Sequence, residues 1–242
     1  MEKYNADTSD IARHHLLFAQ GVMPNTVPTS FWTVYEVFSR PELMRRLRDA
    51  IIEHGITKDE TNDTIELDVA ALKMRVPLLL AVLEETQRTR GTNASIRMVQ
   101  EDTIVGDFKL KKGSYLQIPH QPVHYDGTIW GDDTSHYNPD RFLGKDFPPN
   151  SLSPWGIAPH LCPARQFAST EIMVMIALMV LRVDVVPVGG EWRKLKVSPN
   201  EQSTIPPPKE ELRVELRPRK GWNGKWVLKM GESKTKVALS SG

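Results

Sequence analysis

Residues 154–168 contain the only cysteine of the 242-residue chain and read Pro154-Trp155-Gly156-Ile157-Ala158-Pro159-His160-Leu161-Cys162-Pro163-Ala164-Arg165-Gln166-Phe167-Ala168. Prolines and a glycine mark the first part as a loop, and a helical pattern follows from Ala164 to Val183. A single cysteine cannot form an internal disulfide and makes a cysteine-rich zinc site untenable, which fits a reducing compartment. Taken alone, a cysteine is more often a small buried hydrophobe than a ligand, so the role of Cys162 depends on the rest of the chain.

The composition excludes several broad classes of function. Thirty-one basic residues balance thirty acidic ones. No overall field therefore recruits nucleic acid or an anionic membrane surface. Residues 1–10 are polar and charged, with no apolar stretch that resembles a signal peptide. The longest apolar run, 172–181, is shorter than the roughly 20 residues that span a bilayer, and we interpret it as part of a buried helix.

Helical patterns dominate the first 90 residues. We expect a long helix over 11–38, distorted at Pro24 and Pro28, and a second helix from Pro41 to near Gly55. Residues 57–68 are expected to be a polar connector. The stretch 69–90 is predicted to be helical, with an interruption at Pro77 that divides it into two helices.

The rest of the chain mixes short strands with irregular structure. Strands are predicted at 95–99, 103–105 and 114–118, forming a small antiparallel sheet, and 119–159 is expected to be a long irregular region. Short strands are expected again over 185–217, and residues 218–242 are expected to be a poorly ordered tail. The predicted fold is mainly α with small antiparallel β-sheets, an α+β domain over 1–217.

Two charged motifs accompany the cysteine loop. Glu85-Thr86-Gln87-Arg88 places two opposite charges three residues apart, on one face of a helix. Asn138-Pro139-Asp140-Arg141-Phe142 follows in the irregular region. By itself the first motif is common, and an exposed pair of this kind is worth only a few tenths of a kcal/mol.

In this order and at these separations, the three motifs resemble those of the cytochrome P450 family. The resemblance implies the C-terminal portion of the cytochrome P450 fold, with heme b as cofactor and Cys162 as the thiolate ligand of its iron. Trp155, seven residues before the cysteine, and His160, two before it, match the family's loop. Arg97 and His160 resemble residues that bind the heme propionates, although each could also be a solvated charge. Ala158 and Ala164 replace two usual glycines, which puts the loop geometry in question.

The resemblance also assigns structural roles. Glu85, Arg88 and Arg141 are implied to form one buried charge network that fixes the irregular region and the cysteine loop against the helix. His124 and Trp130 match the family's pattern between these motifs, and we give them a packing role.

A further signal lies at residues 25–32, Asn25-Thr26-Val27-Pro28-Thr29-Ser30-Phe31-Trp32, in the place of the family's distal helix. Most members have an acid followed by threonine there. Asn25 in place of the acid is similar to the branch of sterol hydroxylases and prostacyclin synthase. Thr26 could donate a hydrogen bond to bound oxygen, whereas Asn25 could orient water but cannot serve as an acid. Alternatively, both residues form a polar kink beside the two prolines.

The resemblance covers residues 11–217, about half of a complete member of the family. The complete parent is expected to be a heme-thiolate monooxygenase that binds O₂ and hydroxylates an apolar lipid, sterol or terpenoid-like substrate. Its electrons would come from an NADPH-dependent reductase. It would lie on the cytosolic face of the endoplasmic reticulum membrane, attached through the N-terminal half. Two alternatives stay open: a truncated, inactive heme-binding chain, and an electron-independent isomerase of an oxygenated lipid. The residues do not identify the substrate.

Overall fold

The structure, a computed structural model, describes residues 7–198, 204–231 and 236–240. Its helices are α1 Thr8–Phe38, α2 Pro41–Gly55, α3 Val69–Arg75, α4 Pro77–Arg90, α5 His120–His124, α6 Gly127–Trp130, the 3₁₀ helix η2 Pro139–Phe142 and α7 Arg165–Arg182. Its strands are β1 Ile56–Asp59, β2 Thr64–Asp68, β3 Ala94–Met98, β4 Thr103–Val105, β5 Phe108–Leu110, β6 Tyr115–Pro119, β7 Val183–Pro187, β8 Val214–Pro218 and β9 Lys225–Lys229. The fold is α+β with small sheets, as the sequence predicts.

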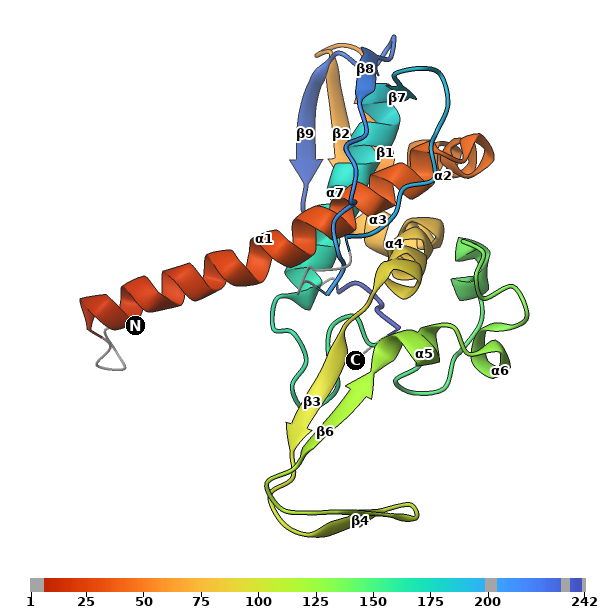
Figure 1. The fold of residues 1–242 in the computed structure, drawn as a ribbon. Helices are drawn as coiled ribbons and strands as arrows, with labels where there is room; N and C mark the ends of the chain where they lie inside the picture. The colour runs from red at the N-terminus through yellow and green to blue at the C-terminus, as the bar shows by residue number, and fades with distance from the viewer. Residues whose placement is uncertain (1–6, 199–203, 232–235, 241–242) are drawn as a thin grey trace.

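The core lies where the C-terminal half of α1 meets α2, α3, α4 and α7 (Figure 1). In α7, Ile172, Ile176 and Val180 recur at helical spacing and are at most 1% exposed, so this face of the helix packs into the core. The α3–α4 break falls at Pro77, which has no N–H to continue a helix and instead starts α4. Helix α1 continues through Pro24 and Pro28 without a break.

The β structure differs from the sequence prediction in three ways. Residues 57–68, expected to be a connector, form the antiparallel β1–β2 hairpin. In β2 polar and apolar residues alternate, so that Ile65 and Leu67 are buried while their neighbours are half-exposed. The predicted single sheet over 95–118 is two separate ladders, β3–β6 and β4–β5. Finally, β9 pairs with β2 in parallel, so that not every ladder is antiparallel.

The segment 218–242, expected to be a poorly ordered tail, contributes to the core in its described part. Trp222 is 7% exposed and Val237 is 3% exposed. The Gln166 side chain exchanges two hydrogen bonds with the backbone of Val237, at 3.1 and 2.7 Å. The Ser240 amide and hydroxyl both donate to the buried Glu84 carboxylate, at 2.6 and 2.8 Å. The boundary predicted at residue 217 therefore does not separate core from tail, because a few apolar residues spread among lysines are enough to attach this segment.

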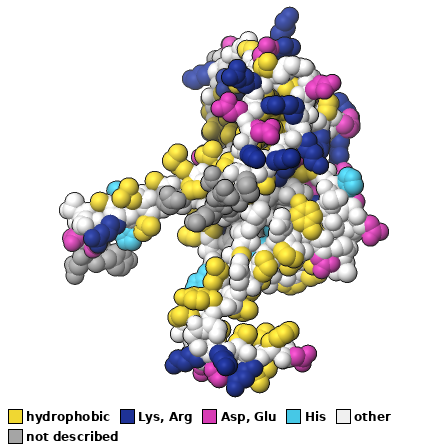
Figure 2. All heavy atoms as spheres, viewed as in Figure 1, with side chains coloured by type: hydrophobic (Ala, Val, Ile, Leu, Met, Phe, Trp, Pro, Cys, Tyr) yellow, Lys and Arg dark blue, Asp and Glu magenta, His cyan; other side chains and the backbone are white. Residues whose placement is uncertain are grey.

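Two parts of the molecule extend away from the core. Figure 1 shows the N-terminal half of α1 projecting from the body on one side, and the β3–β6 ladder running out to β4 on another. Both carry exposed hydrophobic side chains, drawn in yellow in Figure 2. On α1 these include Leu16, Leu17, Phe18 and Met23, each at least 65% exposed.

Candidate functional site

The cysteine loop closes on itself before α7 begins. The Cys162 amide donates to the Trp155 carbonyl at 2.7 Å, which joins the two ends of the loop. At Gly156 φ is +86°, and an added Cβ would lie 2.9 Å from the His160 carbonyl oxygen. Only glycine satisfies both conditions, so Gly156 sets the path of this turn. Ala164 has φ −88°, an ordinary value, and its methyl group brings no backbone strain to the start of α7.

Cys162 is half-buried and lies three residues before the first residue of the 18-residue helix α7. The N-terminal end of a helix carries a partial positive charge, which attracts anionic groups. Among the described residues, the sulfur has no hydrogen-bond partner. The Arg165 side chain donates to the Cys162 carbonyl at 3.1 Å, whereas its buried Nε has no partner in the described part of the chain. The loop therefore presents one thiol with a nearby guanidinium.

Glu85, Arg88 and Arg141 lie together in the interior. Arg88 binds the Glu85 carboxylate in a bidentate arrangement, Nε to Oε2 at 2.7 Å and Nη2 to Oε1 at 2.8 Å. Arg141 Nε adds a third bond to Oε1 at 3.1 Å, and the Asn138 amide adds a fourth at 2.8 Å. Glu85 and Arg88 are fully buried and Arg141 is 5% exposed. One carboxylate thus holds two arginines, from α4 and η2, in a site where charge–charge attraction is strong.

The remaining donors of the two arginines fix the irregular region. Arg88 donates to the backbone carbonyls of His124 and Thr134 at 2.7 and 2.9 Å. Arg141 donates to the Trp130 carbonyl at 2.8 Å and to the Asp133 carboxylate at 3.2 Å. Residues 124–136 belong to no strand, and hydrogen bonds from these two arginines to their backbone carbonyls hold them in place.

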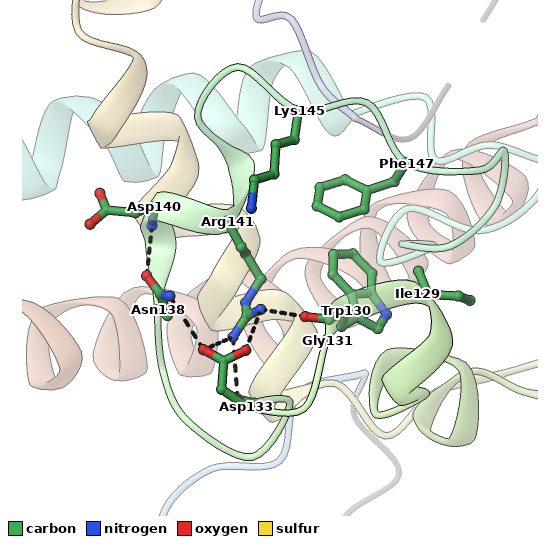
Figure 3. Close-up of a pocket in the computed structure, with 9 residues that line it drawn as sticks. All are labelled: Ile129, Trp130, Gly131, Asp133, Asn138, Asp140, Arg141, Lys145 and Phe147. Atoms are coloured by element: carbon green, nitrogen blue, oxygen red, sulfur yellow. Dashed lines mark hydrogen bonds and ion pairs between the residues drawn. The ribbon is translucent and has the colours of Figure 1, made fainter.

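A shallow pocket lies beside this network (Figure 3). Its lining residues are Ile129, Trp130, Gly131, Asp133, Asn138, Asp140, Arg141, Lys145 and Phe147. Figure 3 shows the Arg141 guanidinium pointing at Asp133 and not into open space. Hydrogen bonds from Arg141 hold the pKa of Asp133 below its usual value. The Arg141 cation at this pocket is already paired, so Arg141 offers no free site for an anion.

His124 and Trp130 are buried, in keeping with a packing role. Trp130 is 4% exposed, stacks 4.4 Å from Phe147, and donates its indole N–H to the Val123 carbonyl at 2.8 Å. His124 is 1% exposed, and neither ring nitrogen has a hydrogen-bond partner among the described residues. Burial, with the charges of His120 and Arg88, lowers the pKa of His124 from 6.5 to about 4.

The residues expected to face the cofactor come from two separate parts of the chain, strand β3 and the cysteine loop. Arg97, on β3, is half-buried and donates only to its neighbouring Ile96 carbonyl at 2.9 Å. His160 is exposed and Trp155 is half-buried, both in the cysteine loop. Within the described residues no hydrogen bond joins Arg97 to either of them. Apart from the bond to Ile96, the Arg97 guanidinium and the His160 ring have no hydrogen-bond partner among the described residues, so both could bind a third group.

Asn25 and Thr26, on α1, differ in the hydrogen bonds that their side chains make. Asn25 uses both ends of its side chain: Nδ2 donates to the Gly21 carbonyl at 3.0 Å and Oδ1 accepts from the Thr204 amide at 3.2 Å. Thr26 is half-buried, and its hydroxyl has no hydrogen-bond partner in the described part of the chain. The hydroxyl of Thr26 is therefore available to another group.

The sequence analysis missed a second buried charge network. Glu36, on α1, is 1% exposed and binds both Arg40 and Arg90. The Arg90 guanidinium also lies 4.0 Å from the ring centre of Trp32. A glutamate within the apolar run 31–38 is the signal that could have indicated it, because a buried carboxylate requires a partner. This network ties the end of α1 to the end of α4.

The comparisons with known proteins agree with these features. The sequence model of the family described as "Cytochrome P450" matches residues 3–214. The chain belongs to the cytochrome P450 family.

Its relatives are named as enzymes of this kind. "Cytochrome P450 monooxygenase nodJ" of Hypoxylon pulicicidum is 36% identical over 97% of this chain and 49% of that protein. A "Cytochrome P450 monooxygenase" of Gibberella zeae is 30% identical over 86% of this chain and 43% of that protein. The "5-beta-cholestane-3-alpha,7-alpha-diol 12-alpha-hydroxylase" of Sus scrofa is 31% identical over 80% of this chain and 43% of that protein. Monooxygenases are oxidoreductases, and this P450 chain spans about half the length of the curated relatives it matches.

None of the described helices is long and apolar enough to cross a membrane.

Proposed function

We propose that this chain is the thiolate-bearing half of a heme monooxygenase that hydroxylates an apolar lipid, sterol or terpenoid-like substrate. The observation that carries the proposal is the position of Cys162. The only thiol of the chain stands half-buried and without a hydrogen-bond partner among the described residues, at the N-terminal end of α7, in a loop closed by the Cys162–Trp155 bond. A thiolate that ligates iron needs this combination of access and positive potential.

The residues present fit heme. Cys162 would ligate the iron, and Trp155 would pack beside the heme. Arg97 and His160 would hold the propionates, since no acid engages either side chain among the described residues. Asn25 and Thr26, on α1, would contribute to the pocket around the heme.

When bound, a thiolate-ligated heme supplies the activation of O₂, because the sulfur donates electron density that favours O–O cleavage. The protein would contribute proton delivery and the exclusion of water. Thr26, with its unengaged hydroxyl on α1, would relay a proton, giving its hydroxyl proton into the pocket as it takes one from ordered water. Asn25 keeps a second N–H and a second lone pair beyond its two protein bonds, with which it could orient that water.

The substrate class and partners are proposals drawn from the relatives. Several are named sterol hydroxylases, and one is named a "Bifunctional cytochrome P450/NADPH--P450 reductase" of Alternaria alternata. We therefore assign an apolar substrate, O₂ and electrons from an NADPH-dependent reductase, with the complete protein on the cytosolic face of the endoplasmic reticulum. Membrane attachment would come from chain outside these 242 residues.

Two observations favour other outcomes. The exposed apolar side chains of α1 would suit a chain that binds heme poorly and is inactive by itself. Asn25 in place of an acid would suit an isomerase of an oxygenated lipid, which needs no external electrons.

The test is the spectrum of the reduced carbon monoxide complex. The heme-loaded protein, as the 242-residue chain or within a full-length parent, should show a red-shifted Soret band typical of thiolate ligation. Cys162→Ser or Cys162→His should abolish that band, because neither side chain provides sulfur. A spectrum that is unchanged by these substitutions would disprove the assignment.

A further inference from the structure

Three hydrogen bonds fix the segment 204–206 between α1 and the chain that leads into β3. The Thr204 amide donates to Asn25 Oδ1 at 3.2 Å, and its carbonyl accepts from the Thr92 amide at 3.0 Å. The Pro206 carbonyl accepts from the indole N–H of Trp32 at 2.8 Å. Both backbone polar groups of Thr204 are therefore used, by two different parts of the fold.

The segment has few donors of its own. Pro206, Pro207 and Pro208 have no backbone N–H, so this stretch cannot be held by a regular strand ladder. Its carbonyls accept bonds from Trp32 and, further along, from the Ser198 amide, which binds the Pro207 carbonyl at 2.9 Å. The donation from Thr204 to Asn25 is one of the bonds that fix the start of the segment.

The amide of Asn25 suits this task. Its Nδ2 donates to the Gly21 carbonyl one turn back at 3.0 Å, which orients the side chain, and its Oδ1 then faces Thr204. An aspartate could accept from Thr204 but could not donate to Gly21, and an apolar residue could do neither. An asparagine at the position where the family usually has an acid thus has a structural reason.

We propose that Asn25 is a positioning residue that holds Thr204–Pro206 against the distal helix. Ile205, 2% exposed, packs into a cluster with Trp32 and Leu195, which leaves Thr204 as the half-buried residue beside Asn25. This inference rests on the proposed function, which puts Asn25 at the heme pocket. Thr204, which is bonded to Asn25, then borders that pocket, and Asn25 fixes its position there.

Amide hydrogen exchange resolved at single residues tests the inference in the 242-residue chain. Asn25→Ala should speed exchange at Thr204 about fivefold, the ratio expected for one lost hydrogen bond. Asn25→Asp should keep Thr204 protected at pH 7, because its carboxylate still accepts. Thr33→Val is the matched control, since it removes a hydroxyl bond to the Thr29 carbonyl in the same helix and leaves Thr204 untouched.

Unchanged protection of Thr204 in Asn25→Ala would overturn the inference. Equal loss of protection in Thr33→Val would also overturn it, because general loosening of α1 would then be the cause. Exchange at Thr204 requires no heme. Failure of the proposed function, seen as a missing thiolate band in the wild-type protein, is therefore distinguishable from failure of the Asn25 contact.

Discussion

At the scale of single residues, Glu85 carries the largest predicted cost. Its carboxylate accepts from Arg88, Arg141 and the Asn138 amide, all within the interior. Glu85→Ala would leave two buried guanidinium groups without their anion, and such a loss costs about 3 to 5 kcal/mol. We expect the free energy of unfolding, measured in urea, to fall by that amount, with little folded protein that retains heme.

The chain contains a matched control for this prediction. Glu42 and Arg45 have the same spacing of three residues on α2, but their side chains are 70% and 61% exposed. Glu42→Ala should leave the free energy of unfolding nearly unchanged, because exposed ion pairs contribute little. Equal effects of the two substitutions, or wild-type stability of Glu85→Ala, would show that the buried network is not what holds residues 119–159.

His124 gives a pH dependence with a defined sign. Its pKa is about 4 in the folded protein against a usual 6.5, chiefly because burial disfavours the charged form. The unfolded chain therefore binds the proton more tightly, and stability should be complete above pH 6.5 and fall toward pH 4. The slope from this group approaches about 1.4 kcal/mol per pH unit.

Urea midpoints of the wild type and His124→Gln across this range would measure the effect. The variant lacks the titrating ring, so the difference between the two proteins should shrink as the pH falls from 6.5 to 4. A constant difference would mean that His124 does not titrate in this range.

At the scale of elements, the sequence predicted the long helices well and the short strands less well. It missed the short helices α5, α6 and η2, which lie within the region 119–159 that was expected to be irregular. Helix boundaries were predicted at two prolines and a glycine, and the structure has them there. Pro41 and Pro77 lack a backbone N–H and start α2 and α4, and Gly91 caps the end of α4. Strand β5 was missed, because three residues give too short a pattern to recognise. Strand β9 was missed because its stability comes from pairing with β2, more than 150 residues away.

The candidate site was also predictable only where its residues form local motifs. Its motifs could be recognised locally, and they named Cys162, Glu85, Arg88 and Arg141. The Glu36–Arg90 contact and the Asn25–Thr204 contact join distant parts of the chain, and no periodicity or spacing in the sequence indicates them. Tertiary contacts of polar side chains outside the family motifs were therefore the part that could not be predicted.

Helix α1 carries the prediction for oxygen activation. Thr26 has a hydroxyl with no hydrogen-bond partner among the described residues, whereas Thr29 binds the Asn25 carbonyl at 2.6 Å. Under the proposed function, Thr26→Ala in a full-length protein should lower product per electron consumed and raise peroxide release. The carbon monoxide spectrum should remain, because Cys162 is untouched. Turnover driven by added peroxide should suffer less, since that oxidant already carries its protons. If wild type and Thr26→Ala formed the same amount of product per electron consumed, Thr26 would have only a structural role in α1.

At the scale of the whole molecule, two apolar surfaces stand apart from the core. Leu16, Leu17 and Phe18 are 67% to 73% exposed on α1, and Ile104, Phe108 and Tyr115 are each 75% exposed around the β4–β5 ladder. Figure 2 shows such side chains on both projecting parts of the chain. Soluble monomers rarely expose apolar side chains in groups of this kind. Since the relatives are about twice as long, we propose that additional chain covers these surfaces in a complete P450.

The last prediction concerns the 242-residue chain by itself. With these surfaces uncovered, it should self-associate during gel filtration and bind heme weakly in a spectral titration, because it offers the thiolate side of the pocket and only part of the opposite wall. Leu17→Ser with Phe18→Ser should reduce self-association and leave the melting temperature unchanged, since both side chains lie outside the core. Co-expression with the N-terminal half of a close relative should reduce self-association and tighten heme binding together. A monomeric chain that binds one heme tightly and turns over substrate without added sequence would contradict this prediction, and would show that the exposed part of α1 closes the pocket itself.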